Sequence, residues 1–193
     1  RLEWKICCFN TRGKNFKMIF EELTLKGVFI IQLEKLEDDR GFFSRSWDKI
    51  EFEKHGLNTK IVQSNISFNK NKGTLRGLHY QISPFEEAKL VRCTQGKIYE
   101  VMLDLRKESK TYKQWESIEL SKDNYNLLYI PEGFALGFQT LEDNTELFYQ
   151  MSEKYVPESA RGINYKDPEF NIKWPLEINT ISDRDSSFEF FKE

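Results

Sequence analysis

Hydrophobic and polar positions along this chain follow a pattern of short strands rather than long helices. Aromatic and β-branched residues gather in runs of about four to eight, the length and composition typical of β-strands. Turns that contain Gly or Pro separate several runs, at residues 71–73, 95–97 and 131–133. The predicted strands are 28–33, 61–65, 90–93, 98–105, 115–120, 127–130, 136–140 and 145–152. Many short strands with almost no helix indicate an all-β sandwich or barrel.

One helix is predicted, over residues 48–55. Asp48 and Glu51 stand at capping-box spacing, and Gly56 provides a stop signal after the last turn. His55 lies at the end of this helix, where the helix dipole favours a cation. We therefore interpret His55 as a structural residue.

The only other histidine, His79, stands in a different setting. It lies in residues 74–81, a strand-like run that also contains Arg76. These two residues would point to opposite sides of a regular strand, so Gly77 between them predicts a bulge that re-aims them. A lone histidine in a barrel is more often a hydrogen-bonded structural residue than a catalytic one. The run by itself leaves both interpretations open.

The composition is that of one globular domain. The chain has 193 residues, of which 39% are hydrophobic and 31% charged. No apolar run approaches the roughly 20 residues that cross a bilayer, and the net charge of -2 disfavours nucleic acid as a partner. Cys7, Cys8 and Cys93 make no even disulfide framework, so we expect a reducing, cytoplasmic setting.

The first residues differ from the rest of the chain. Residues 1–17 carry basic side chains and two cysteines without periodicity, and they lack the apolar core of a secretory signal. Met18 then opens a stretch that leads into the first strand-like run. We expect an N-terminal extension over residues 1–17, outside the core, and a single domain over residues 18–193.

A set of motifs carries a family resemblance from about Met18 to Asp185. The motifs are DRGFF at 39–43, QSN at 63–65, GTLRGLHYQ at 73–81, KLVR at 89–92, IPEGFA at 130–135, LFY at 147–149, DP at 167–168, IKWP at 172–175 and ISDRD at 181–185. Together they resemble the dTDP-4-dehydrorhamnose 3,5-epimerases. The resemblance implies a cupin-like jelly-roll β-barrel with one or two short helices, acting without a cofactor or metal on a nucleotide-linked 4-keto-6-deoxy sugar.

The chemistry of that family fits these residue types. A ketone at C4 acidifies the protons on C3 and C5, and inversion needs a base on one face, an acid on the other and a group that stabilises the enolate. By resemblance, His79 is the base, and Asp185 fixes its tautomer. Lys89 would place positive charge beside the enolate oxygen, and Tyr149 would deliver a proton from the opposite face.

The resemblance also implies how the substrate is bound. Arg40 and Arg76 would bind the diphosphate, because the fork of a guanidinium bonds two phosphate oxygens. The amides of Gln63 and Asn65 would bond the sugar or the nucleotide. The aromatic rings of Phe43 and Tyr155 would pack on the base. The family is a homodimer with an exchanged strand, so Arg40 and Phe43 would serve the site of the neighbouring subunit.

Three positions depart from the family pattern. Leu136 stands where the family usually has a histidine, Glu100 where it has an aspartate, and Arg45 where it has a glutamate. The loss of a polar group at Leu136 leaves open whether C3, C5 or both are inverted, and which sugar is accepted.

Three alternatives therefore stand beside the 3,5-epimerase. One is a single-centre 3- or 5-epimerase for another nucleotide-linked ketosugar. A second is a non-catalytic cupin-like binder of sugar nucleotides, which the joint presence of His79, Lys89, Tyr149 and Asp185 disfavours. The third, a metal-dependent cupin oxygenase, is opposed because two distant histidines cannot build its usual ligand shell.

Overall fold

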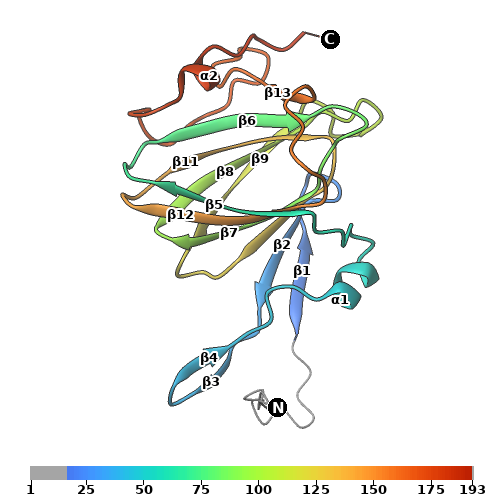
Figure 1. Ribbon diagram of the computed structural model, residues 1–193, viewed down its shortest axis with the longest axis vertical. Helices are drawn as coiled ribbons and strands as arrows, with labels where there is room; N and C mark the ends of the chain where they lie inside the picture. Colours follow the sequence, from blue (N-terminus) through green and yellow to red (C-terminus); the bar gives the residue numbers. More distant parts are fainter. Residues whose placement is uncertain (1–16, 193) are drawn as a thin grey trace, which may run out of the picture.

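Strands make up nearly all of the secondary structure of this chain. The computed structural model describes residues 17–192 (Figure 1). Its elements are β1 (Met18–Glu22), β2 (Phe29–Leu33), β3 (Leu36–Asp38), β4 (Gly41–Phe43), α1 (Lys49–Lys54), β5 (Gln63–Asn69), β6 (Leu75–Gln81), β7 (Lys89–Gln95), β8 (Lys97–Asp104), β9 (Trp115–Ser121), β10 (Leu127–Ile130), β11 (Phe134–Thr140), β12 (Thr145–Met151), β13 (Ala160–Gly162) and α2 (Asp183–Ser186). The predicted all-β class with one or two short helices is confirmed, since the described residues form two.

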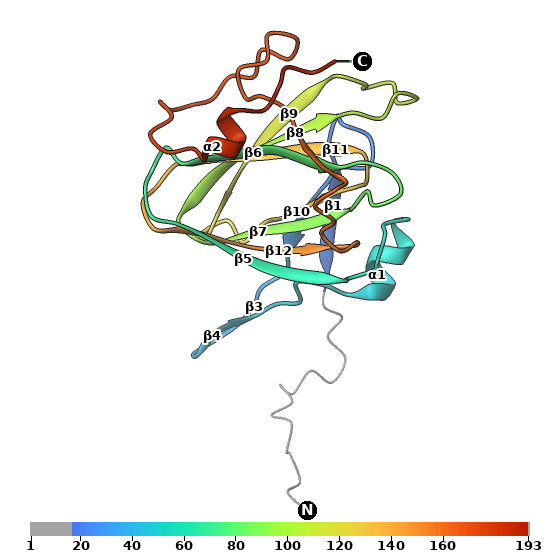
Figure 2. The same cartoon turned by 45° about the horizontal axis from the view of Figure 1, so that its top comes forward.

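Two antiparallel sheets face each other and enclose the interior of the barrel. One has six strands in the order β1-β2-β10-β7-β12-β5, and the other has five in the order β13-β6-β11-β8-β9. Strands β3 and β4 form a separate hairpin, which projects away from both sheets in Figures 1 and 2. Most neighbouring strands are far apart in the sequence, as in jelly-roll folds.

The observed strands differ from the predicted ones where the hydrophobic alternation is weak. β5 begins two residues later and ends four residues later than the predicted strand 61–65. Its residues Gln63 and Asn65 are polar and point inward, whereas Ile66 and Phe68 are exposed, so the usual apolar-in, polar-out pattern is reversed. The pattern does not predict β1, β3, β4 or β13, because three of these strands have only three residues each.

Apolar side chains that point between the sheets form the main core. Ile98 and Met102 of β8 pack in one cluster with Leu128 and Ile130 of β10, and all four are sealed from solvent. Burial of each such side chain contributes roughly 1.5–3 kcal/mol. This cluster holds the two sheets together and so positions the neighbouring inward residues.

The C-terminal segment covers the outer face of the five-stranded sheet (Figures 1 and 2). Ile163 and Phe170 of this segment pack against Val101 and Leu103 of β8. Helix α2 lies near the end of the segment and is hydrogen-bonded to β6. The packing of the segment therefore fixes the place of α2.

Helix α1 covers part of the outer face of the six-stranded sheet and has the predicted ends. Asp48 caps it by accepting hydrogen bonds from the backbone N–H groups of Ile50 and Glu51. His55 is the C-terminal cap residue, and its ring stacks on Phe20 with centroids 3.9 Å apart. These contacts agree with a structural role for His55.

The described part of the chain contains no helix that is long and apolar enough to cross a membrane. Of the extension predicted over residues 1–17, only Lys17 lies within the described residues. Its carbonyl accepts a hydrogen bond from the backbone N–H of Glu34 at 3.2 Å, next to β1.

Candidate active site

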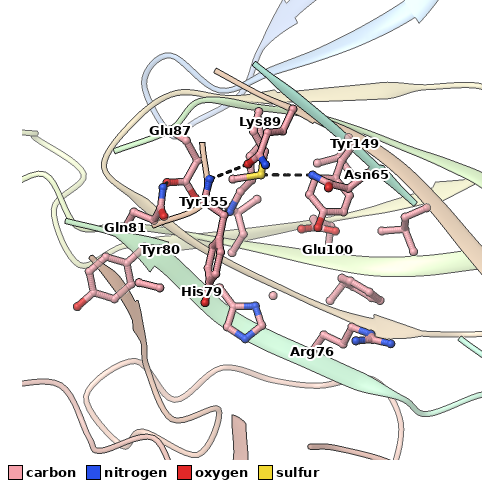
Figure 3. A pocket seen from close by; sticks show the side chains of 18 of the residues that line it. Asn65, Arg76, His79, Tyr80, Gln81, Glu87, Lys89, Glu100, Tyr149 and Tyr155 are labelled. Atoms are coloured by element: carbon pink, nitrogen blue, oxygen red, sulfur yellow. Dashed lines mark hydrogen bonds and ion pairs between the residues drawn. The ribbon is translucent and has the colours of Figure 1, made fainter. Parts of the chain in front are cut away.

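A cavity of about 430 Å³ opens between the two sheets (Figure 3). Inward-facing residues of β5, β7 and β12 form one wall, and residues of β6, β8 and β11 form the other. Seven of the ten site residues that the sequence predicts line this cavity: Gln63, Asn65, Arg76, His79, Lys89, Tyr149 and Tyr155.

Asp185 lies directly behind His79. The Nε2 atom of His79 donates a hydrogen bond to Oδ1 of Asp185 at 2.8 Å, and the backbone N–H of Gly77 donates to Oδ2 at 3.0 Å. Burial opposes ionisation of Asp185, but these hydrogen bonds outweigh it and hold the pKa of the carboxyl below its ordinary value. A carboxylate on Nε2 fixes the proton there, so Nδ1 is the nitrogen left for chemistry.

Helix α2 explains why Asp185 is held in this place. Ser182 caps the helix, and its hydroxyl accepts a hydrogen bond from the backbone N–H of Asp185 at 3.0 Å. Only 5% of Asp185 is exposed. The contact joins residues 106 positions apart in the chain, so no local pattern predicts its geometry.

The bulge predicted in β6 is present at Gly77. His79 pairs with Leu136 of β11, whereas Arg76 pairs with Phe138, so three steps along β6 match two steps along β11. Gly77 has φ +125°, and a Cβ atom there would clash with the backbone of β11. The extra residue turns both Arg76 and His79 toward the cavity.

Lys89 enters the cavity from β7 with a partner that the sequence does not predict. Its Nζ atom lies 2.9 Å from Oε1 of Glu87, and the other carboxylate oxygen, Oε2, accepts a hydrogen bond from Nε2 of Gln81 at 3.0 Å. The side chain of Lys89 is 13% exposed and that of Glu87 is 4% exposed. The cation is therefore held in a largely buried ion pair.

Tyr149 enters from β12, in the sheet opposite the one that carries His79 (Figure 3). Burial raises the pKa of its phenol, and nearby Arg76 only partly offsets this effect. The hydroxyl therefore stays protonated at neutral pH. A phenol and an imidazole thus lie on opposite walls of one cavity.

Polar and cationic groups surround this pair. Gln63 accepts a hydrogen bond from the backbone N–H of Tyr155 at 2.6 Å, and Arg76 donates from Nε to Asn69 at 2.7 Å. Arg161 and Arg184 also line the cavity, although the sequence does not predict them as site residues. Arg184 directly precedes Asp185 in the 181–185 motif, and this adjacency is the only signal that could have identified it.

Arg40 and Phe43 do not line the cavity of this chain. Both lie on or next to the β3–β4 hairpin, where Arg40 donates from Nε to Oδ1 of Asp38 at 3.2 Å. The hairpin projects away from the barrel (Figure 1). Any contribution of these residues to an active site therefore requires a second chain.

The three departures from the family pattern have different surroundings. Leu136 and Glu100 both line the cavity and are buried, with 6% and 3% of each residue exposed. Arg45 instead bonds Asp48 at 2.9 Å, beside α1 and outside the cavity. Only Leu136 and Glu100 can therefore act directly on a molecule bound there.

The family model described as dTDP-4-dehydrorhamnose 3,5-epimerase matches residues 22–193. The chain belongs to the dTDP-4-dehydrorhamnose 3,5-epimerase family. A relative with this name from Sinorhizobium fredii is 40% identical over 172 residues, which are 89% of this chain and 88% of the relative. The predictions of the family, of the cupin-like fold and of an enzyme of the epimerase type are confirmed.

Solved structures of the family have the same architecture. The enzyme from Bacillus anthracis, with TDP and PPi bound, superposes with a TM-score of 0.87 at 38% identity and covers 91% of this chain and 100% of that one. The enzyme from Legionella pneumophila, in complex with dTDP-4-keto-L-rhamnose, has a TM-score of 0.84 at 35% identity and covers 90% and 93%. A 3'-monoepimerase from Streptomyces bikiniensis, in complex with dTDP-quinovose, has a TM-score of 0.80 at 28% identity and covers 87% and 85%.

Proposed function

We propose that this chain inverts C3 and C5 of a dTDP-linked 4-keto-6-deoxy sugar by proton abstraction and reprotonation. One observation carries the proposal: His79, bonded to Asp185, and Tyr149 enter the same cavity from opposite sheets. Inversion of a carbon next to a ketone needs this arrangement, because the proton leaves one face and returns to the other.

His79 is the base in this mechanism. Its Nδ1 atom removes the proton from C3 or C5, and the imidazolium that forms is stabilised by the carboxylate of Asp185. The electrons left on carbon move to the C4 oxygen, where the positive charge of Lys89 stabilises the enolate. Glu87 keeps the ammonium group in place between turnovers.

Tyr149 is the acid. Its phenol returns a proton to carbon from the face opposite His79, and its raised pKa keeps that proton available at neutral pH. After the inversion of one carbon, His79 carries the abstracted proton and Tyr149 lacks one. Solvent must therefore restore both groups, which makes the reaction visible by isotope exchange.

Arginine side chains of the cavity bind the diphosphate in this proposal. Arg76 lies on β6, and Arg184 follows the cap of α2, where it donates to the hydroxyl of Tyr155 at 3.3 Å. Guanidinium groups bond phosphate oxygens in pairs. Gln63 and Asn65 would bond the sugar or the nucleotide, and Tyr155 would pack on the base.

A single-centre epimerase is the second candidate function. A 3'-monoepimerase shares the fold, so the fold alone does not separate one inversion from two. The apolar side chain of Leu136 favours one pose of the ring, because it cannot bond a sugar hydroxyl during reorientation of the intermediate. We therefore expect C3 and C5 to react at unequal rates.

We also propose that the enzyme is a cytoplasmic homodimer formed by residues 18–193. Support for the dimer comes from Ile66, Phe68 and Phe148, which are 67%, 47% and 37% exposed on the outer faces of adjacent strands β5 and β12. Such an apolar patch is typical of an interaction surface. The projecting hairpin would bring Arg40 and Phe43 to the partner's cavity. Support for the compartment comes from the free buried thiol of Cys93.

Isotope exchange tests the proposed function directly. The enzyme is incubated with dTDP-4-keto-6-deoxyglucose in deuterated water, and NMR follows the protons on C3 and C5. We expect deuterium at both carbons and formation of the inverted product. Exchange at a single carbon would favour the single-centre epimerase, and binding without exchange would favour a sugar-nucleotide binder.

A further inference from the structure

Glu100 of β8 is an unusual group in the cavity wall. It points into the barrel from the same face of the strand as Ile98 and Met102, and only 3% of the residue is exposed. Among buried side-chain polar atoms of residues 17–192, only Arg92 Nε and Glu100 Oε2 have no hydrogen-bond partner. Of these two residues, only Glu100 lines the cavity.

None of the residues around Glu100 forms a hydrogen bond with its buried Oε2 atom. Its cross-strand neighbours are Ile118 on β9 and Phe138 on β11, which are both apolar. The titratable and charged groups of the cavity on the other elements are Arg76, His79, Tyr80, Glu87, Lys89, Tyr149, Tyr155, Arg161 and Arg184. Three of these groups already have a partner: Arg76 bonds Asn69, His79 bonds Asp185, and Lys89 pairs with Glu87.

Burial therefore decides the protonation state of Glu100. It raises the pKa of the carboxyl to about 8, although the charge of Lys89 acts in the opposite direction. At neutral pH the group is a carboxylic acid, which offers one O–H donor. A donor in the cavity wall without a protein acceptor is free to bond an acceptor on a ligand.

We propose that Glu100 is a catalytic residue that, as a neutral acid, donates a hydrogen bond to the C4 oxygen of the sugar as this oxygen becomes an enolate. The inference rests on the proposed function. The proton stays on Glu100, and no bond to carbon changes through it. A neutral donor adds to the effect of Lys89, whereas an ionised Glu100 would repel the developing negative charge.

Leu136 adds no charge or hydrogen bond that would oppose the neutral state of Glu100. In the register of β8 and β11, Glu100 pairs with Phe138 and Met102 pairs with Leu136, so Leu136 is a diagonal neighbour of Glu100 on the inward face. A cationic or hydrogen-bonding side chain at that position would lie within reach of the carboxyl and would favour its ionisation. Two of the three departures from the family pattern thus act together.

The pH profile of kcat/KM tests this role. We expect the rate of the parent enzyme to fall above about pH 8, as Glu100 ionises. Glu100→Gln, which keeps a neutral donor, should lose about three- to tenfold at pH 7 and should lose this alkaline limb. Glu100→Leu, which has no donor, should lose about 10²-fold. Glu87→Gln is the matched control, because it alters the other carboxyl of the cavity and should retain the limb.

An infrared difference spectrum supplies a readout that does not depend on turnover. The spectrum of the parent minus that of the Glu100→Gln variant should show the C=O band of a carboxylic acid at pH 7. Above about pH 8, carboxylate bands should replace it. A carboxylate at pH 7, or an alkaline limb that survives in Glu100→Gln, would overturn the inference while leaving the epimerase intact. A parent enzyme that exchanges neither sugar proton would overturn the proposed function as well.

Discussion

The interior of the barrel has two parts that are built by the same strands but behave differently. In the packed part, inward residues such as Ile98, Met102 and Leu128 are apolar and sealed from solvent. In the cavity, most inward residues of the same sheets are polar and reach a hollow space. Strand β8 belongs to both parts, because Glu100 lies between Ile98 and Met102 on one face.

The difference shows how one alternating pattern can serve stability and chemistry together. Most charges of the cavity have a partner, as His79 has Asp185 and Lys89 has Glu87. Pairing limits the cost of burying charge. Glu100 lacks such a partner and is neutral instead. If the two parts are separate in function, substitutions in the cavity should leave stability unchanged, and substitutions in the packed part should leave proton exchange unchanged.

Removal of the base should have the largest effect. His79→Asn keeps a polar side chain of similar size but cannot abstract a proton, so we expect deuterium exchange at C3 and C5 to fall by about 10³-fold or more. The melting temperature and dTDP binding should stay close to those of the parent. Exchange within tenfold of the parent rate would remove His79 from the mechanism.

Truncation of a side chain in the packed part should lower stability and leave proton exchange unchanged, the opposite of what we expect for His79→Asn. Leu128→Ala deletes a fully buried side chain, and we expect the free energy of unfolding to fall by about 2–5 kcal/mol. Exchange at both carbons should persist at temperatures where the variant is folded. Urea unfolding and NMR exchange on the same sample check both statements, and loss of exchange in the folded variant would contradict the separation.

Removal of the proposed acid, Tyr149, should affect inversion and proton exchange to different extents, unlike removal of the proposed base, His79. Tyr149→Phe removes the proton donor opposite His79, so formation of inverted product should fall by about 10²-fold. Washout of substrate protons should fall less, because His79 can still remove a proton and return a deuteron to the same face. If washout and inversion fall by the same factor, Tyr149 acts in proton abstraction and not only in reprotonation.

Leu136 should set the balance between the two carbons. We expect one carbon to exchange at least about tenfold faster than the other in the parent, a difference of roughly 1.4 kcal/mol in barrier height. Leu136→His should narrow this gap, since the diagonal neighbour Glu100 can orient the new ring. Time courses of deuterium incorporation at C3 and C5 in both proteins test this prediction. Equal rates at the two carbons in the parent would show that Leu136 has no effect on their balance.

Chelation should have no effect. Within residues 17–192 there is no group of three or more His, Cys, Asp or Glu side chains that could hold a metal ion. The C4 ketone already acidifies the adjacent protons, so we expect full activity after exhaustive treatment with a chelator. Activity that is lost and then restored by one divalent cation would show that the enzyme needs a metal.

Local patterns in the sequence determined the all-β class, the ends of helix α1 and the bulge at Gly77. Each depends on interactions within a few residues: strand alternation, a side-chain cap, or a conformation that only glycine adopts readily. The resemblance added the set of site residues. Seven of these line one cavity, which no local signal could establish.

Only the tertiary structure decided how those residues meet. The contact of Asp185 with His79 spans 106 positions. The ion pair of Lys89 with Glu87 is not evident from their spacing, since Glu87 lies in the loop before β7 and the path of that loop depends on the whole fold. The neutral state of Glu100 follows from burial and from apolar neighbours on two other strands. Burial depends on every element that closes the barrel. The titratable side chains could therefore be identified in the sequence, whereas their protonation states depend on how the chain packs around them.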